Sequence, residues 1–586
     1  MKQFFEAVGR PISLVPLFVR YWKSLIQVIV IAVAAALGFW GWEKVNHPVT
    51  WGDSINNVFR TLQLLTFQLR TPGDVDFRIS WQLNVARFLL PAAALVGSYR
   101  LLLGSIRSPA RLAMLGLRRG HVIVAPGRGP TGEALLHDLR NSGLRAVAVM
   151  ADIRAEDRIR IEEYGLAALP GDPFLKATWH QARADRADLI VIANGNDVEN
   201  LNITVTVAEA LRYGRRRRDP MLVMALEDQL LAEQIDFALD NAARGSGLRY
   251  RRLSVPGEAA RTIFLDPPLS KYKLNRDDPS HIIVLGLGPG ARAVLRHALT
   301  LAQDAAVAGP RISILASEEE LAAERLLQQD TIPAYVAGLR GIACDMSSTL
   351  PLSVFETLAS ENHTPVLACI CLPDDAAVSS AIALARHATL LNWPHFPIAV
   401  HQQREDRFLS LLARENTMPG HSRLRPFGGL LPPGTLVRLQ HQQRDKVPQA
   451  VHEHYLELLE RQGATDGTRT AWDDLPENYR HANGAFADHI PVKLAAIGCR
   501  IVNGTAPPFE FTGDEVDALA RIEHRRWSAE RLLQGWRLGE RNEAQRLHPD
   551  LVPFECLTEL GQEKDRHTVS SLPRILALAG QSICRD

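Results

Sequence analysis

The chain has few cysteines and no excess of charge of either sign. Its 586 residues include six cysteines, none of them in a Cys-x-x-Cys pair or at a spacing typical of zinc ligands. We therefore expect reduced thiols in a cytosolic portion and no metal site. Lysine and arginine total 66 against 65 aspartates and glutamates, and 46% of the residues are apolar. The charge balance argues against a nucleic-acid partner, and the apolar fraction argues against disorder.

Familiar catalytic motifs are missing as well. The sequence contains neither a P-loop nor a Gly-x-Ser-x-Gly elbow, and no Tyr-x-x-x-Lys or Cys/His arrangement lies beside the glycine-rich turn described next. We therefore expect no enzymatic activity and no catalytic residues. An NAD-dependent oxidoreductase ranks last among the functions considered, and the length of the chain predicts three or four domains.

An apolar strand that runs straight into a Gly-x-Gly-x-x-Gly turn stands at residues 121–132. Such a turn needs glycine because the backbone must bend sharply and come close to a phosphate. The charge of the phosphate then meets the free N–H groups of the following helix. The turn therefore predicts a nucleotide site formed by Gly127, Arg128, Gly129, Thr131 and Gly132.

Further motifs follow where a nucleotide-binding fold would place them. A second strand over 145–152 ends in Asp152, about 20 residues past the turn, in position to accept hydrogen bonds from ribose hydroxyls. A Gly-Asp pair ending in Asp172 follows the third strand, and the fourth strand leads through Asn194 to an Asp-x-x-Asn pattern that ends at Asn200. We expect Asp152, Asp172 and Asn194 to contact the ligand.

The order of these four motifs resembles the TrkA-N, or RCK, domain, which regulates potassium channels and transporters. The resemblance covers about Gly120 to Leu230. It implies an α/β Rossmann-like domain, placed at 120–270, whose ligand is NAD(H) or another adenine nucleotide. A Rossmann-like domain that has lost its ligand is the alternative.

The glycine-rich motif returns after roughly 160 residues, which indicates an internal repeat. Gly286 and Gly288 stand in the second turn and are expected to contact a nucleotide if one binds there. The strand that follows ends at Ser317, where the first copy has its ribose carboxylate. We interpret 280–439 as a second RCK-like domain that is mainly structural.

Two apolar stretches precede the first copy. Residues 24–42 carry no charge and are long enough for a membrane-spanning helix. A second candidate span, 81–103, has Arg87 and Arg100 on either side of its apolar centre, where both can reach lipid head groups. The alternative for it is a hydrophobic helix lying on the membrane or against the next domain.

Basic residues orient this predicted hairpin, which we place at 24–106 behind a cytoplasmic segment at 1–23. Positive charge favours the cytoplasmic side of a membrane, so both termini are expected to be cytoplasmic, in a bacterial inner (plasma) membrane. The basic residues before the first span and after the second are Lys2, Arg10, Arg20, Lys23, Arg107, Arg111, Arg118 and Arg119.

The loop between the spans carries an amphipathic helix within 51–70. Helix, re-entrant loop and second span resemble the pore module of two-span cation channels, including the plant Castor and Pollux type with tandem RCK-like domains. The resemblance implies a homo-oligomer, most simply a tetramer, with Thr66, Phe67 and Gln68 in the pore. This stretch has no glycine, which argues against a potassium filter. An extracytoplasmic loop without a pore is the alternative.

After a mostly polar stretch interpreted as a linker, 440–471, the chain changes character. The patterns His524-x-x-Trp527, Gly-Trp536-x-x-Gly and His548-Pro-x-Leu-Val-Pro, followed by Glu-Lys-Asp-Arg566, resemble the RyR domain repeated in ryanodine receptors. The resemblance covers about 472–578 and implies a small, mostly α-helical ligand or interaction module at 472–586.

The tryptophans of this region offer flat faces on which a purine could stack. Nearby cations could hold phosphates, among them Arg526 and Lys564. The alternative is that both tryptophans fill a small helical core. The predicted ligand pocket consists of Arg525, Trp527, Arg531, Trp536 and His548.

Together these patterns favour a ligand-gated, ion-channel-like membrane protein whose RCK and RyR domains sense a nucleotide and control cation flux. A second hypothesis is a membrane-permeabilising defence or stress effector triggered by a nucleotide second messenger.

Overall fold

The computed structural model divides the chain into two compact units, Met1–Met114 and Leu115–Asp586. It describes residues 15–48, 50–66, 79–96, 120–212, 219–265, 269, 278–306, 308–324, 327, 335–345, 354–356, 358, 365–402, 409, 411, 423–429, 431–440, 446–461, 469–504 and 508–586. Within these ranges the side chains of 15–28, 155, 229, 230, 233, 234, 237, 374, 458 and 459 are left undescribed.

The first unit consists of helices. Helix α2, Val15–Asn46, precedes α3, Trp51–Gln63, the 3-10 helix η1, Leu64–Thr66, and a helix over Trp81–Val96. Within α2, Ile29–Asn46 is long and apolar enough to cross a membrane, and among the described residues it alone meets that criterion. Trp81–Val96 is apolar but shorter. A second span over 81–103 stays a prediction, since 97–103 lie outside the described residues.

One of the three predicted pore residues belongs to the described part of the chain. Thr66 ends η1, and its hydroxyl donates to the backbone oxygen of Gln63 at 2.9 Å. Phe67 and Gln68 lie outside the described residues. The pore therefore stays a prediction.

Helix α3 buries polar side chains and exposes apolar ones. Asn57 and Thr61 are almost fully buried, and Asn57 Nδ2 donates to Glu43 Oε1 of α2 at 3.0 Å. Gly38 of α2 leaves no room for a side chain beside Thr61. In water the hydrophobic effect favours the reverse arrangement, so this face is suited to apolar surroundings. The exposed apolar residues of α3 are Trp51, Ile55, Val58, Phe59 and Leu62.

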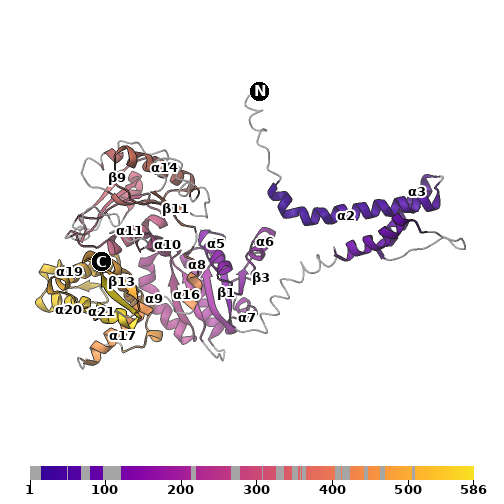
Figure 1. Cartoon of the computed structure of the whole chain (residues 1–586). Helices are drawn as coiled ribbons and strands as arrows, with labels where there is room; N and C mark the ends of the chain where they lie inside the picture. The colour runs from indigo at the N-terminus through magenta and orange to yellow at the C-terminus, as the bar shows by residue number, and fades with distance from the viewer. Residues whose placement is uncertain are drawn as a thin grey trace. The chain divides into compact units, whose positions relative to one another are not determined.

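The first α/β domain is a parallel six-stranded sheet with helices between its strands (Figure 1). Its strand order, β3-β2-β1-β4-β5-β6, places β1 at the centre, and every residue of β1, β2 and β5 is buried. Helices on both faces of a parallel sheet explain these continuous apolar runs. The elements are β1 His121–Pro126, α5 Pro130–Asn141, β2 Ala146–Met150, α6 Ala155–Glu163, β3 Ala167–Pro170, α7 Lys176–Gln181, η2 Ala184–Arg186, β4 Ala187–Ala193, α8 Asp197–Leu211, β5 Met221–Ala225, α9 Gln229–Gly245, β6 Arg249–Leu253 and α10 Val255–Leu265.

The second α/β domain repeats this topology. Its order, β12-β11-β10-β7-β8-β9, matches the first sheet strand for strand when read from β9, and all its pairings are parallel. The predicted tandem repeat is therefore confirmed. The elements are β7 His281–Leu285, α11 Pro289–Leu301, β8 Arg311–Ala316, α12 Glu318–Ala323, β9 Gly338–Ala343, β10 Pro365–Ile370, α14 Asp374–Leu390, β11 Ile398–Gln402 and β12 Leu424–Gly428.

After β12 the chain returns to the first α/β domain through helix α16, Thr435–Gln440. The carboxylate of Asp138 in α5 accepts hydrogen bonds from the backbone N–H groups of Gly434 and Leu436, at 2.7 and 2.8 Å. Leu431 and Leu436 are buried in the core formed by α5 and its sheet. The chain after the second domain thus contributes to the core of the first.

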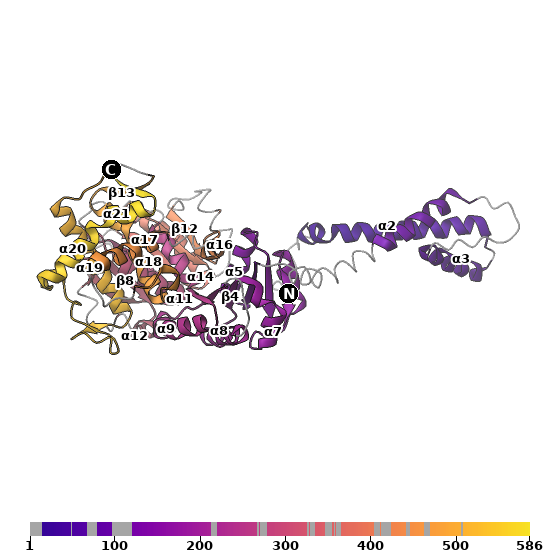
Figure 2. The same ribbon diagram turned by 90° about the horizontal axis from the view of Figure 1, so that it is seen from below.

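The C-terminal domain is mostly helical, with one two-stranded antiparallel sheet, β13–β16 (Figure 2). The stretch predicted as a linker contains helix α17. The apolar side of this helix packs into the core of the C-terminal domain, where Ala450 is buried. The elements are α17 Lys446–Arg461, η8 Trp472–Asp474, α18 Glu477–Ala496, β13 Cys499–Asn503, α19 Gly513–Leu533, β14 Arg537–Leu538, β15 Leu547–His548, η9 Phe554–Cys556, α20 Glu559–Ser570, α21 Leu572–Leu578 and β16 Gln581–Arg585.

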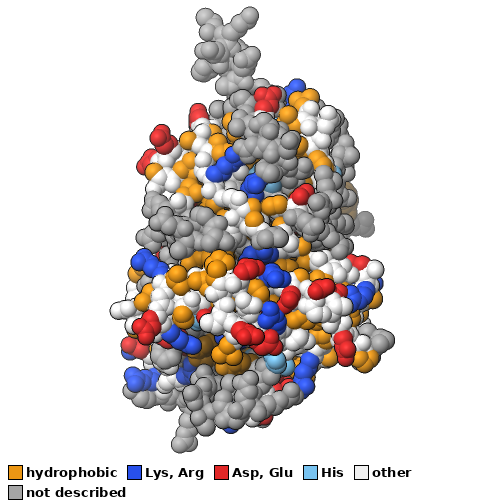
Figure 3. All heavy atoms as spheres, turned by 90° about the vertical axis from the view of Figure 1, so that its left-hand side faces the viewer, with side chains coloured by type: hydrophobic (Ala, Val, Ile, Leu, Met, Phe, Trp, Pro, Cys, Tyr) orange, Lys and Arg blue, Asp and Glu red, His pale blue; other side chains and the backbone are white. Residues whose placement is uncertain are grey.

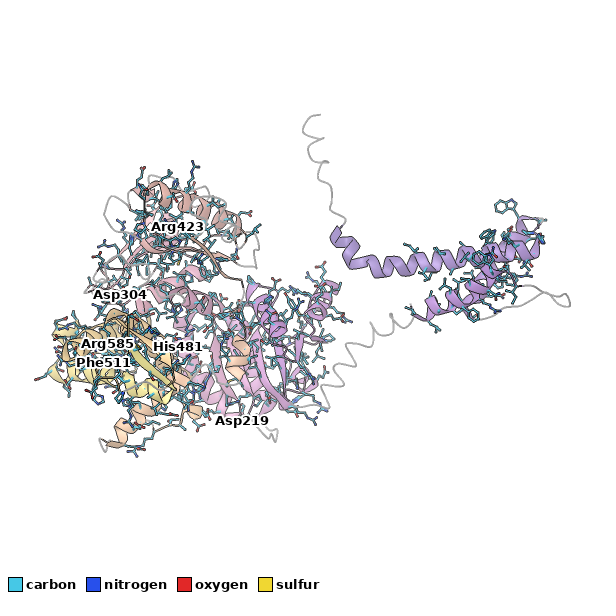
Figure 4. All side chains as sticks on the ribbon, in the orientation of Figure 1. Asp219, Asp304, Arg423, His481, Phe511 and Arg585 are labelled. Atoms are coloured by element: carbon cyan, nitrogen blue, oxygen red, sulfur yellow. The ribbon has the colours of Figure 1, made fainter. Side chains whose placement is uncertain are left out.

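This C-terminal domain contacts both α/β domains. On the first, Glu477 accepts from Arg251 Nη1 at 3.1 Å, and both side chains are buried. On the second, Arg525 Nη2 donates at 2.5 Å to the backbone oxygen of Asp304, marked in Figure 4, and His489 Nε2 lies 2.8 Å from the backbone oxygen of Gln303. One face of the molecule shows Lys/Arg and Asp/Glu side chains interspersed (Figure 3), in keeping with the balanced charge of the sequence.

Glu477 makes the contact with the first α/β domain sensitive to pH. Burial raises its pKa to about 7, against the opposing charges of Arg251 and Arg252. Because the folded pKa lies above the ordinary glutamate value, this contribution to stability is present at low pH and is lost as pH rises through about 7. We expect Glu477→Gln to flatten the fall in melting temperature between about pH 5 and pH 8, measured by thermal unfolding of the full-length protein in detergent. An equal fall in both proteins contradicts this assignment.

Candidate functional site

The first α/β domain places its glycine-rich turn where the strand order reverses. Strand β1 pairs with β2 on one side and with β4 on the other, and the chain leaves β1 through Gly127. In open α/β sheets, ligands bind outside the carboxyl ends of strands at such a switch point. The predicted site therefore lies at the edge of the sheet that suits a ligand.

The three glycines of the turn have different surroundings. A Cβ atom on Gly127 would lie 2.0 Å from the carbonyl oxygen of Asn194, and one on Gly132 would lie 2.3 Å from the carbonyl oxygen of Gly127. Neither contact is sterically possible. A Cβ atom on Gly129 would meet nothing within 4 Å. Gly127 and Gly132 thus allow the turn to pack, while Gly129 leaves open space beside the helix start.

Helix α5 begins at that open position. Gly129 is its N-cap residue and Pro130 follows at the first helical position, so the turn leads directly into the helix N-terminus. Unpaired N–H groups at a helix N-terminus attract anions. Thr131 Oγ1 donates to Glu227 Oε1 at 3.1 Å, which joins this turn to the end of β5. Desolvation, with a smaller effect of Asp197, raises the pKa of Glu227.

Arg128 and Asp152 meet beside the turn. Asp152 is exposed just after β2, as expected for a ribose-binding carboxylate. Arg128 Nη2 donates to the backbone oxygen of Asp152 at 2.6 Å and to Asp157 Oδ2 of α6 at 2.9 Å. Sequence reasoning missed Asp157, because its relation to Arg128 depends on how β2 and α6 place two distant residues together.

The other two predicted contacts of this site stabilise the loops around it. Asp172 Oδ1 accepts from Phe174 N at 3.0 Å and so shapes the turn after β3. Asn194 N donates to Asn200 Oδ1 at 2.7 Å, and Asn200 Nδ2 reaches the backbone oxygen of Ala225 at 3.0 Å. The buried Asn200 therefore ties the ends of β4 and β5, a role that its place in the Asp-x-x-Asn pattern signals.

The second glycine-rich turn is built differently. Gly286 has φ +88°, a conformation that favours glycine, and a Cβ atom there would also meet the carbonyl oxygen of Cys371. Gly288 faces open space, but a Cβ atom on Gly290 would lie 2.8 Å from the ring of His401. Ser317 caps α12, where its hydroxyl accepts from Glu320 N at 3.3 Å. Its position therefore supplies a helix cap in place of a ribose carboxylate.

In the C-terminal domain, four predicted residues form one half-buried cluster. The rings of Trp527 and His548 lie 4.9 Å apart, those of Trp536 and His548 6.2 Å apart, and the guanidinium of Arg531 lies over both indoles, at 5.9 and 5.0 Å. Burial lowers the pKa of His548, and nearby cations, among them Lys564, add to that effect. The tryptophans also pack against a buried cluster that combines residues of the second α/β domain with Leu532 and Leu551 of the C-terminal domain.

Two cations of the same helix have structural roles. Arg526 is buried and bonds Glu523 at 2.7 Å and Glu530 at 2.5 Å, so it belongs to the domain's core rather than to an accessible phosphate site. Arg525 instead holds the domain against the second α/β domain through Asp304. Sequence spacing contains a signal for Arg526, since glutamates three residues before and four after it face the same side of a helix.

One Ser-His-Asp arrangement occurs in this domain. His524 Nδ1 lies 3.0 Å from Asp565 Oδ2, and Ser528 Oγ lies 3.5 Å from His524 Nε2. The same Nε2 is only 2.7 Å from the backbone oxygen of Val552, and Ser528 is fully buried. Both ring nitrogens therefore face acceptors, so the histidine is not placed to take a proton from the serine.

The different surroundings of the glycines give a testable prediction. We expect Gly127→Ala and Gly132→Ala to lower the free energy of unfolding by about 1–3 kcal/mol, because the added methyl groups overpack the turn. Gly129→Ala, whose backbone is extended and whose surroundings are open, is expected to leave it almost unchanged. Denaturant unfolding of the full-length variants in detergent measures this. A loss for Gly129→Ala as large as for Gly127→Ala contradicts the assigned roles.

Solved structures provide distant similarities. GsuK bound to ADP is 15% identical, with 73% of this chain and 99% of that chain covered and a TM-score of 0.36. The GsuK channel bound to NAD is 12% identical, with coverages of 74% and 84% and a TM-score of 0.37. A dipicolinate synthase from Bacillus halodurans is 12% identical, with coverages of 48% and 81% and a TM-score of 0.17. These identities and TM-scores are low, so the similarities assign no function to this chain.

A sequence search of curated proteins finds no match. Two family models do match the chain. The TrkA-N domain matches residues 122–224, around the first glycine-rich turn, and the RyR domain matches residues 512–585, around the aromatic cluster. Both resemblances predicted from the motifs are thereby confirmed: the chain carries a TrkA-N domain in its first α/β domain and an RyR domain at its C-terminal end.

Proposed function

We propose that this protein is a ligand-gated, ion-channel-like membrane protein whose TrkA-N and RyR domains sense a nucleotide. The observation that carries the proposal is the glycine-rich turn of the TrkA-N domain, which leaves open space at Gly129 beside a helix N-terminus. The same chain also contains the first, helical unit, whose helix α3 exposes apolar side chains. The role is regulatory rather than enzymatic.

The ligand proposed for the first site is NAD(H) or another adenine nucleotide. Its phosphates would meet the backbone N–H groups at the start of α5, where Gly129 allows a close approach. Its ribose would meet the exposed carboxylate of Asp152. Both features belong to the same edge of the sheet, and Arg128 joins them.

The first unit is proposed to lie in the bacterial inner membrane, with two spans and both termini cytoplasmic. Support comes from α3, which turns its apolar residues outward and its polar residues toward α2. Two spans cannot enclose a pore alone, so the working form is a homo-oligomer, with a tetramer the simplest case. A ligand opens such a pore only if it binds the open arrangement more tightly.

A second candidate function is favoured by the aromatic cluster of the RyR domain. Trp527, Trp536 and His548 surround the guanidinium of Arg531, which suits an anionic ligand with an aromatic ring. A nucleotide second messenger bound there would trigger permeabilisation of the membrane. The protein would then be a defence or stress effector.

Ion flux from proteoliposomes that hold the full-length protein tests the proposed function. NAD, NADH, ATP, ADP-ribose and cyclic nucleotides are added one at a time. We expect one of them to start flux, because the ligand shifts the closed and open populations. If only a cyclic nucleotide starts flux, and if this flux is lost in Trp536→Ala, the result favours the defence or stress effector. Tight nucleotide binding without flux contradicts the pore.

Asp152 tests the ligand site directly. We expect Asp152→Ala to weaken NAD binding about tenfold, since hydrogen bonds between a carboxylate and ribose hydroxyls are lost. Isothermal titration calorimetry measures the affinity, and the unfolding transition should not change. Glu162→Ala, an exposed acid at the far end of α6, is the matched control. Unchanged affinity in Asp152→Ala removes that residue from the site.

A further inference from the structure

A chain of alternating charges lies beside the glycine-rich turn of the TrkA-N site. Arg128 Nη2 lies 2.9 Å from Asp157 Oδ2, and Arg160 Nη2 lies 3.1 Å from Asp157 Oδ1. Arg160 Nη1 in turn lies 3.0 Å from Glu133 Oε1 in the first turn of α5. The chain starts in the glycine-rich turn, crosses to α6 and returns to α5. Its two cations and two carboxylates have no net charge.

Asp157 is the residue that fixes Arg128 within this chain. Its side chain is only 8% exposed, while that of Arg128 is 44% exposed. Burial raises the pKa of Asp157, but hydrogen bonds from Arg128 and from the Arg154 N–H outweigh that effect and hold the pKa below its usual range. The carboxylate is therefore ionised at neutral pH. It neutralises a guanidinium that is still partly open to solvent.

The position of this guanidinium matters because the ribose of the proposed nucleotide would lie beside it. Arg128 Nη2 also donates to the backbone oxygen of Asp152 at 2.6 Å, so it lies beside the proposed ribose-binding carboxylate. In dinucleotide sites an acid there accepts the ribose 2′-hydroxyl, whereas an available arginine accommodates a 2′-phosphate. Here both an acid, Asp152, and an arginine, Arg128, are present. Whether the site accepts a 2′-hydroxyl or a 2′-phosphate then depends on Asp157, the partner of Arg128.

We propose that Asp157 is a specificity-determining residue of the TrkA-N site. Because Asp157 pairs with Arg128, this guanidinium is not available to bind a 2′-phosphate. The site therefore selects an adenine dinucleotide with a free 2′-hydroxyl. This inference rests on the proposed nucleotide-binding function. A 2′-phosphate would meet the carboxylates of Asp152 and Asp157 without a free guanidinium between them, and like charges at short range repel.

The test measures the affinities of NAD and NADP for the full-length protein in detergent by calorimetry. Asp157→Asn keeps the size of the side chain and one oxygen acceptor, but it removes the negative charge that neutralises Arg128. We expect the Kd of NADP divided by that of NAD to fall about tenfold, because a charge-assisted bond to the phosphate becomes possible. Arg128→Gln should shift the ratio in the opposite direction, since it removes a cation near the 2′-phosphate and leaves Asp157 with Arg160 as its remaining partner of this chain.

Glu133→Gln is the matched control. It removes the other carboxylate of the charge chain without releasing Arg128, so both affinities should move together and the ratio should stay constant. Combining Arg128→Gln with Asp157→Asn should cancel the gain in NADP affinity. Should Asp157→Asn fail to fold, the opposite shift in Arg128→Gln still tests the inference.

Two failures are distinguishable. If the unaltered protein binds NAD but neither Asp157→Asn nor Arg128→Gln changes the ratio, Asp157 has no role in specificity and the inference is overturned. The inference is also overturned if both variants shift the ratio in the same direction. If the unaltered protein binds neither dinucleotide, the proposed ligand itself is wrong, and the inference falls with it.

Discussion

The close approach between the glycine-rich turn and the end of β4 is the constraint on which the site depends. Gly127 has no room for a side chain because the carbonyl of Asn194 lies against it. Gly127 N also donates to the backbone oxygen of Ala193 at 2.6 Å. This contact fixes the direction in which α5 leaves the sheet, and therefore where its N-terminus points. The open space at Gly129, the bond from Thr131 to Glu227 just after β5 and the bond from Arg128 to Asp157 of α6 all depend on it.

The sequence predicted local features well because they depend on neighbouring residues. Strand, turn and helix around Gly127, and their repetition around Gly286, follow from apolar runs and glycine spacing. Arg526 is a different case, since its spacing to Glu523 and Glu530 is itself a local signal for an ion-pair cluster on one side of a helix. The contact of Arg525 with Asp304 joins residues 221 positions apart, and no periodic pattern encodes it. Asp157 was missed for the same physical reason.

The two α/β domains share one topology but differ in the residues around their glycine-rich turns. In the first, the residue after β2 is an exposed carboxylate and the start of α5 is open. In the second, the corresponding residue caps a helix, and a histidine ring packs against Gly290. The C-terminal domain contacts both, through Glu477 on one and Arg525 on the other. Both α/β domains are therefore in contact with the same helical domain.

The return of the chain through α16 has a consequence for biosynthesis. Leu431 and Leu436 belong to the core of the first α/β domain, and the bond from Leu436 N to Asp138 spans 298 residues. A ribosome that has just finished the first six strands has not yet made these residues. The first domain must therefore wait, with part of its apolar core open, until the entire second domain has been translated. Until then, the apolar residues of the first domain that pack against Leu431 and Leu436 lack these partners.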